Sequence, residues 1–172
     1  MINELYERSA IMHGHKCPGL AIGVRAGAEA LALLDVTERG HNLYCIAESR
    51  ACYQDGIQTV FRTTLGNGNL ELRERGKAAF NFYDRATGKS IRLCAKPLPK
   101  GMNKQQMIDF ILTAPVEQVF SQTALHFDVP PETFSGKKKA VCSRCGEECG
   151  EPYFRIVDGQ VLCMDCVCGS EE

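Results

Sequence analysis

The fold of this chain is organised around residues 13–27, HGHKCPGLAIGVRAG, which join a His/Cys-rich turn to the start of an apolar helix. Pro18 has a fixed φ and no backbone N–H, so it suits the first turn of a helix that we expect to run to about Leu34. Cys17 then falls at the N-cap, where the partial positive charge of the helix end favours the thiolate. Because imidazole and thiolate both bind transition metals, the turn is a candidate metal site, with buried packing as the alternative.

A second candidate segment follows a strand predicted at residues 42–48. It contains Cys52 and Asp55, one helical turn apart, at the start of a short helix predicted to end near Phe61. If the start of this helix meets the His/Cys turn, Cys52 becomes an additional ligand or a redox partner. The alternative is that Cys52 is a small buried residue, which is common for free cysteine.

Together these segments predict a metal site with three ligands. His15, Cys17 and Cys52 would bind the ion, for which we expect zinc, and a fourth position would stay open for water or substrate. His13 and Asp55 would orient ligands or move protons. The catalytic candidates are accordingly Cys17, Cys52, His13 and Asp55. In a metal-free version of the site, Cys17 would be an activated thiol that Cys52 resolves.

The predicted helix carries a stripe of glycines, Gly19, Gly23 and Gly27, spaced by four residues. Each glycine inside a helix costs up to about 1 kcal/mol relative to alanine, so three in register indicate that another backbone packs very close. That backbone belongs either to a neighbouring helix or to a second subunit. We expect a homodimer, with the stripe as its candidate interface.

The other periodic segments predict an α+β core of residues 1–128, with helices packed on a small, mainly antiparallel sheet. A Pro-containing stretch at residues 129–140 is expected to be a linker. The elements that we expect besides those above are a helix at residues 2–12, a hairpin of residues 78–83 and 90–94, a helix from Asn103 to about Leu112, and a second helix from Pro115 through Phe127.

The terminal module, residues 141–172, carries two CxxC motifs separated by seventeen residues. This spacing is typical of the closed tetrahedral shell of a structural zinc in a zinc ribbon or treble-clef-like fold, here around a hairpin that turns at Asp158-Gly159. A module of about 30 residues has too little core to fold without the metal. The expected ligands are Cys142, Cys145, Cys163 and Cys166, and Cys149 and Cys168 remain as alternatives.

The composition bounds the function. The chain has 172 residues, of which 44% are hydrophobic, and a formal net charge of −1, so no electrostatic surplus favours nucleic acid or an anionic membrane. Ten cysteines, six of them in the last 31 residues, favour metal ligation in a reducing compartment over disulfides. No signal-like segment and no apolar run of about 20 residues is present, so we expect a cytoplasmic protein.

Three motifs in order resemble the FmdE family of formylmethanofuran dehydrogenase components: residues 13–27, residues 52–58 (CYQDGIQ) and residues 65–70 (LGNGNL). The resemblance implies an α+β core that dimerises, with a metal-binding cavity lined by the His/Cys turn and the segment around Cys52. It also implies association with molybdenum or tungsten formylmethanofuran dehydrogenases, which act on one-carbon units. Thr63 replaces a cysteine and Asn67 a lysine of the family pattern, which removes a thiol and an amine from the expected site.

Two functional hypotheses follow. The first is a metal-dependent oxidoreductase of one-carbon or redox metabolism, or an accessory subunit of one. The second is a non-catalytic protein that carries or senses a metal and whose zinc module docks a protein partner. The module has more acidic than basic residues, so we expect no binding to nucleic acid.

Overall fold

The structure is a computed structural model that describes residues 1–36, 40–125, 128–129, 138–151 and 153–169. The chain divides into two compact units, Met1–Pro130, here called the core unit, and Pro131–Glu172, here called the terminal unit. The division falls inside the predicted linker, most of which lies outside the described residues. None of the described helices is both long and apolar enough to cross a membrane.

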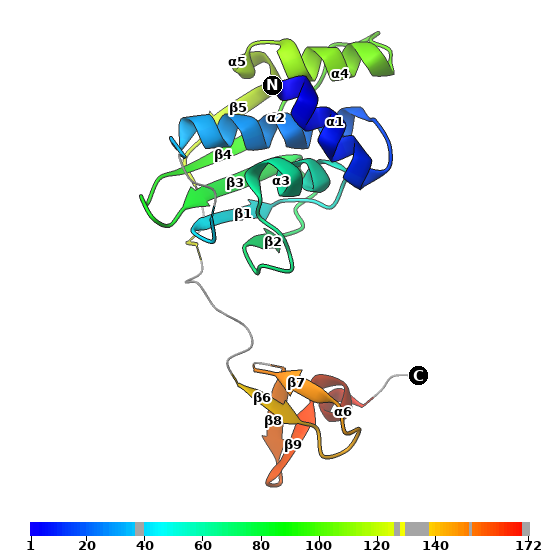
Figure 1. Cartoon of the computed structure of the whole chain (residues 1–172), viewed down its shortest axis with the longest axis vertical. Coiled ribbons are helices and arrows are strands. Elements are labelled where there is room, and N and C mark those ends of the chain that lie inside the picture. Colours follow the sequence, from blue (N-terminus) through cyan, green and yellow to red (C-terminus); the bar gives the residue numbers. More distant parts are fainter. Residues whose placement is uncertain (37–39, 126–127, 130–137, 152, 170–172) are drawn as a thin grey trace. The chain divides into compact units, whose positions relative to one another are not determined.

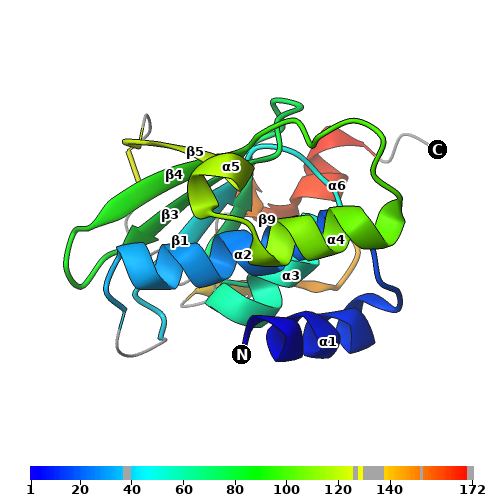
Figure 2. The same cartoon turned by 90° about the horizontal axis from the view of Figure 1, so that it is seen from above.

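The core unit is a five-stranded sheet whose one face is covered by helices (Figures 1 and 2). The strand order is β2-β1-β3-β4-β5, and only the pair of β1 and β2 is parallel. This confirms the predicted α+β class with a mainly antiparallel sheet. The helices are α1 (Ile2–His13), α2 (Pro18–Leu33), α3 (Tyr53–Phe61), α4 (Lys104–Thr113) and α5 (Val116–Val119). The strands are β1 (Leu43–Ala47), β2 (Leu70–Leu72), β3 (Ala79–Asp84), β4 (Ser90–Ala95) and β5 (Phe120–Thr123).

Aromatic contacts fix α3 on the sheet. Alternate residues of β3, Phe80 and Phe82, point toward the helices, as the two-residue period of a strand requires. Their rings meet those of Tyr53 and Phe61 edge-on, with centroids 5.0 and 4.7 Å apart. All four side chains are buried, and each such ring pair adds about 0.5–1.5 kcal/mol beyond its buried area. The N-terminal end of α3, which carries Cys52, is therefore held in a defined position.

The glycine stripe of α2 packs against α3 of the same chain. A Cβ atom at Gly23 would overlap the carbonyl oxygen of Tyr53 and lie 2.6 Å from its carbonyl carbon. From the other side, a Cβ atom at Gly56 of α3 would lie 2.6 Å from the backbone nitrogen of Val24. The prediction of a closely packed neighbouring helix is confirmed. The prediction that the stripe forms a dimer interface is wrong, because the stripe is already covered.

Both edge strands differ from the sequence prediction. The helix predicted from Pro115 through Phe127 is wrong: α5 is one turn long, and β5 follows it and pairs antiparallel with β4. Phe120 enters the core from β5, and Phe127 lies outside the described residues. The three-residue strand β2 was not predicted. In segments this short, the hydrogen bonds to a neighbouring strand decide the structure, and they leave little trace in local periodicity.

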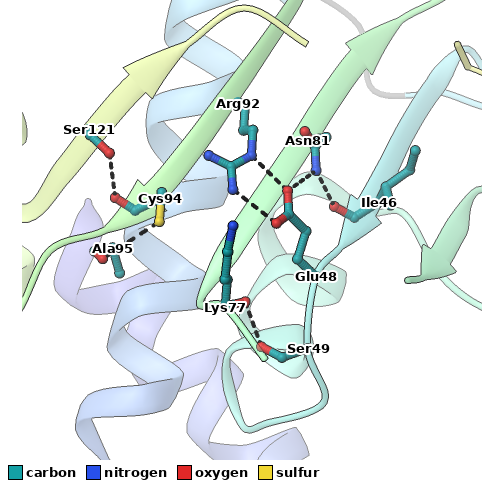
Figure 3. A network of polar contacts seen from close by, with 9 residues as sticks. All are labelled: Ile46, Glu48, Ser49, Lys77, Asn81, Arg92, Cys94, Ala95 and Ser121. Carbon is teal, nitrogen blue, oxygen red and sulfur yellow. Dashed lines mark hydrogen bonds and ion pairs between the residues drawn. The ribbon is translucent and has the colours of Figure 1, made fainter. Parts of the chain in front are cut away.

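A buried ion pair lies on the sheet face away from the helices (Figure 3). Arg92 of β4 donates two hydrogen bonds to the carboxylate of Glu48, with N···O distances of 2.7 and 2.9 Å. Asn81 of β3 donates to the same carboxylate at 3.0 Å and to the carbonyl oxygen of Ile46 at 3.3 Å. The bonds from Arg92, together with that from Asn81, hold the pKa of Glu48 below its usual range. The network thus joins the central strands at one end.

We expect Arg92→Leu to lower the free energy of unfolding by about 3 kcal/mol at pH 7, because it leaves the Glu48 charge buried without its partner. In the wild type, the stabilisation from ionised Glu48 is present above the unfolded pKa of about 4.3 and is lost as the pH falls through the lower folded pKa. The cost of Arg92→Leu should therefore shrink in acid, where Glu48 becomes neutral. Urea unfolding at pH 7 and pH 4 measures both effects.

The exposed pair of Arg50 and Glu74, 3.9 Å apart, provides the control for this prediction. Arg50→Leu should change stability by less than about 1 kcal/mol, because solvent screens such a pair. An equal cost for Arg50→Leu and Arg92→Leu would contradict the role given to the Glu48 network.

The terminal unit consists of two small hairpins and one short helix. Its elements are β6 (Lys139–Val141), β7 (Glu148–Gly150), β8 (Phe154–Val157), β9 (Gln160–Cys163) and α6 (Met164–Cys168). The strands β8 and β9 turn at Asp158 and Gly159, which both have positive φ, 50° and 77°, as tight hairpin turns require. The predicted hairpin and the ribbon or treble-clef-like class of the module are confirmed.

Candidate metal centres

The first cluster, here called the His/Cys site, lies in the core unit where α1 ends and where α2 and α3 begin. It consists of His13, His15, Cys17 and Cys52, and one candidate ligand atom from each lies within 4.8 Å of the others. Bonds of about 2.0–2.3 Å around a tetrahedral ion place its ligand atoms about 3.3–3.8 Å apart. A small movement of these side chains would therefore bring all four onto one ion.

Backbone features at three helix ends bring these residues together. Gly14 ends α1 in the left-handed conformation, with φ 87°, and so redirects the chain after His13. Cys17 is the N-cap of α2, as predicted, and its Sγ accepts a hydrogen bond from the backbone N–H of Leu20 at 3.3 Å. Cys52 is the N-cap of α3, and it approaches α2 because a Cβ atom at Gly19 would lie only 3.2 Å from the Cβ atom of Cys52.

His13 lies among the potential ligands and is held there by Asp55. The Nδ1 atom of His13 lies 2.7 Å from Asp55 Oδ2, which leaves Nε2 toward the site, 3.9 Å from Cys17 Sγ. A carboxylate that fixes the ring of a metal-binding histidine is the usual arrangement in metalloproteins. The sequence analysis gave His13 an orienting role and did not count it as a ligand. The spacing of His13 and Cys17 by four residues was the signal that it could have used.

The electrostatics of the His/Cys site favour a cation. Burial and the neighbouring Cys17 sulfur raise the pKa of the Cys52 thiol. Burial and Cys17 also raise the pKa of Tyr6, to about 12, and the Tyr6 hydroxyl donates to the carbonyl oxygen of Cys17 at 3.1 Å. Two adjacent thiols ionise together only with difficulty, and a bound metal ion removes that repulsion.

The second cluster, here called the four-cysteine site, consists of the predicted cysteines of the terminal unit: Cys142, Cys145, Cys163 and Cys166. Their Sγ atoms lie within 4.8 Å of one another, with 3.8 Å between those of Cys145 and Cys163. Backbone N–H groups of Cys145 and Cys163 lower the pKa of Cys142 to about 6. Burial and the other thiols raise the pKa of Cys166 to about 12. One thiolate forms readily, and a divalent cation would stabilise the others.

The two remaining cysteines of this unit lie outside the four. Cys149 is half-buried against the cluster, and its thiol donates to the carbonyl oxygen of Ala140 at 3.5 Å. Cys168 is exposed at the end of α6. The structure thus selects the predicted four ligands over these alternatives.

The two positions that depart from the family pattern lie away from the His/Cys site. Thr63 and Asn67 follow the C-terminal end of α3, whereas Cys52 precedes its N-terminal end, and the nine residues of this helix span roughly 13 Å. Thr63 is fully buried, and its Oγ1 has no hydrogen-bond partner among the described residues. Within one chain, these two replacements leave the His/Cys site unchanged.

The fold and the two clusters define an α+β protein with candidate sites for two transition-metal ions. Residues 12–121 match the sequence model of the family described as "FmdE, Molybdenum formylmethanofuran dehydrogenase operon". The chain belongs to this family, as its motifs indicated.

Two further proteins are similar to this chain. A crystal structure of a tungsten formylmethanofuran dehydrogenase FmdE-like protein from Syntrophus aciditrophicus has the same fold, with a TM-score of 0.65 and 22% identity, over 99% of this chain and 94% of that chain. A protein of Archaeoglobus fulgidus described as a probable S-adenosyl-L-methionine-binding protein is 34% identical over 97 residues, which are 54% of this chain. The chain spans only 26% of the length of that relative.

Proposed function

We propose that this protein binds two metal ions, a structural zinc at the four-cysteine site and a second zinc ion at the His/Cys site. The observation that carries the proposal is the convergence of two imidazoles and two thiols, from three helix ends, within 4.8 Å. Such a set of two nitrogen and two sulfur ligands in a tetrahedral arrangement suits zinc. The hydrogen bond from His13 to Asp55 supports the same interpretation, because it prepares one ring for coordination.

The first candidate role for the His/Cys site is catalytic or accessory, in one-carbon or redox metabolism related to formylmethanofuran dehydrogenase. His15 is the most exposed of the four side chains. If water or substrate takes its place, His13, Cys17 and Cys52 form a site with three protein ligands and one open position. Membership of the FmdE family supports this role.

The second candidate role is non-catalytic carriage or sensing of a metal. Four protein ligands fill a tetrahedral shell and leave no position for a substrate, which is the arrangement of structural sites. The presence of four candidate ligands, where the sequence analysis expected three, favours this role. The terminal unit would then dock a protein partner.

Elemental analysis of protein purified without chelator or affinity tag tests the proposal. We expect two metal ions per chain in the wild type and one in Cys17→Ala, with Cys94→Ala as the control, because Cys94 of β4 belongs to neither cluster. His15→Ala separates the two roles: it keeps the second ion if His15 occupies the open position and loses it if all four ligands are needed. One ion per chain in both wild type and Cys17→Ala would refute the second site.

Association with other chains is part of the proposal. We propose a homodimer and a partner such as a molybdenum or tungsten enzyme, which the family description supports by naming the operon of molybdenum formylmethanofuran dehydrogenase. Since α3 covers the glycine stripe, a dimer would use another surface of the core unit.

A further inference from the structure

A pocket of about 260 Å³ lies at the end of α3 opposite to the His/Cys site. Gly40 and His41, which precede β1, form one part of it, and Arg62, Asn67 and Asn69, which connect α3 to β2, form the other. The helix between this pocket and Cys52 spans roughly 13 Å, so the two sites are separate within one chain.

The backbone of the connecting segment is fixed by its own hydrogen bonds. Thr64 anchors it twice: its N–H donates to Asn69 Oδ1 at 2.7 Å, and its Oγ1 accepts from the N–H of Asn67 at 3.1 Å. Since the Oδ1 atom of the buried Asn69 is used in this way, the other polar group of that side chain is its NH2 donor. The lining is thus preformed.

Arg62 gives the pocket a full positive charge. It is the C-cap of α3, with φ 65°, and no carboxylate among the described residues forms an ion pair with it. The carbonyl end of α3 carries a partial negative charge, which a nearby cation offsets, so compensation of the helix end is the alternative role for Arg62. Compensation alone does not account for the imidazole of His41 and the two carboxamides beside it.

We infer that this pocket binds the phosphoryl group of a small metabolite. The lining offers a guanidinium, an imidazole and two carboxamide groups and includes no carboxylate. These donors outnumber the two oxygens of a carboxylate and suit the three terminal oxygens of a phosphoryl group, with which a guanidinium forms paired, charge-assisted hydrogen bonds. The volume lies below the range of about 300–1,000 Å³ that is usual for sites of drug-sized ligands, which points to a small ligand.

Titration of the full-length protein with inorganic phosphate, followed by NMR of its backbone amides, tests this inference. Saturable shifts are expected at residues 40–41 and 62–69. Arg62→Asn removes the guanidinium while asparagine tolerates the left-handed backbone, so this variant should fold and bind phosphate about tenfold more weakly or worse. Asn67→Lys adds a cation to the lining and should tighten binding.

Two controls and one competing ligand complete the experiment. Arg8→Gln, on α1, and Cys17→Ala, in the His/Cys site, should titrate like the wild type. The inference is overturned if phosphate causes no saturable shift at these amides, if Arg62→Asn binds it as tightly as the wild type, or if acetate binds more tightly than phosphate.

Discussion

Removal of the metal from the four-cysteine site should unfold the terminal unit and leave the core unit folded. The buried hydrophobic cluster of the terminal unit contains only Cys142, Leu162 and Cys163, so two of its three members are themselves metal ligands. Structural zinc in zinc-finger peptides contributes an apparent free energy of about 10–16 kcal/mol at pH 7, which far exceeds what so small a core supplies. Cys163→Ser should have the same effect as a chelator.

Limited proteolysis measures this effect. In Cys163→Ser, cleavage within residues 139–168 should become at least about tenfold faster, while the core unit stays resistant. Cys149→Ser is the matched control, because Cys149 packs beside the cluster but is not one of its four ligands. Equal protection of the terminal unit in Cys163→Ser and in the wild type would show that the unit folds without metal.

Gly23→Ala should be among the most damaging single substitutions in the core unit. The added Cβ atom would overlap the carbonyl oxygen of Tyr53, and because this neighbour is backbone, it cannot move aside as a flexible side chain would. Overpacking commonly costs 1–3 kcal/mol, and a clash with backbone should cost about 3 kcal/mol or more. Since Cys17 and Cys52 cap the two helices that would be forced apart, the His/Cys site should lose its metal as well.

Thermal unfolding and metal analysis of the same sample test both consequences. Gly66→Ala is the control, since a Cβ atom at Gly66 would meet no atom within 4 Å, and its effect should stay within about 0.5 kcal/mol. A Gly23→Ala protein with the melting temperature and metal content of the wild type would contradict the close packing of α2 on α3.

Features that depend on local chemistry were predicted from the sequence. Pro18 and the cysteine before it fixed the start of α2, and Asp158-Gly159 fixed the terminal hairpin. The spacing of the CxxC motifs identified all four cysteines of the four-cysteine site. Each of these signals lies within a few residues of the structure that it specifies, so one sequence is sufficient to read it.

Features that depend on contacts between distant segments were not predicted. Asp55 holds His13 across 42 residues of sequence, and Arg92 pairs with Glu48 across 44. Nothing in the sequence around either residue specifies such a partner. The strand β5 was mistaken for helix for the same reason, because its pairing with β4 outweighs the helical spacing of its apolar residues.

Anomalous diffraction at the zinc absorption edge, from crystals of protein purified without chelator, tests the central claim most directly. The account predicts two peaks per chain. One should lie among the sulfur atoms of the four-cysteine site, and the other about 2.0–2.3 Å from Cys17 Sγ, Cys52 Sγ and His13 Nε2. A single peak at the four-cysteine site, with the side chains of the His/Cys site bridged by no ion, would contradict it.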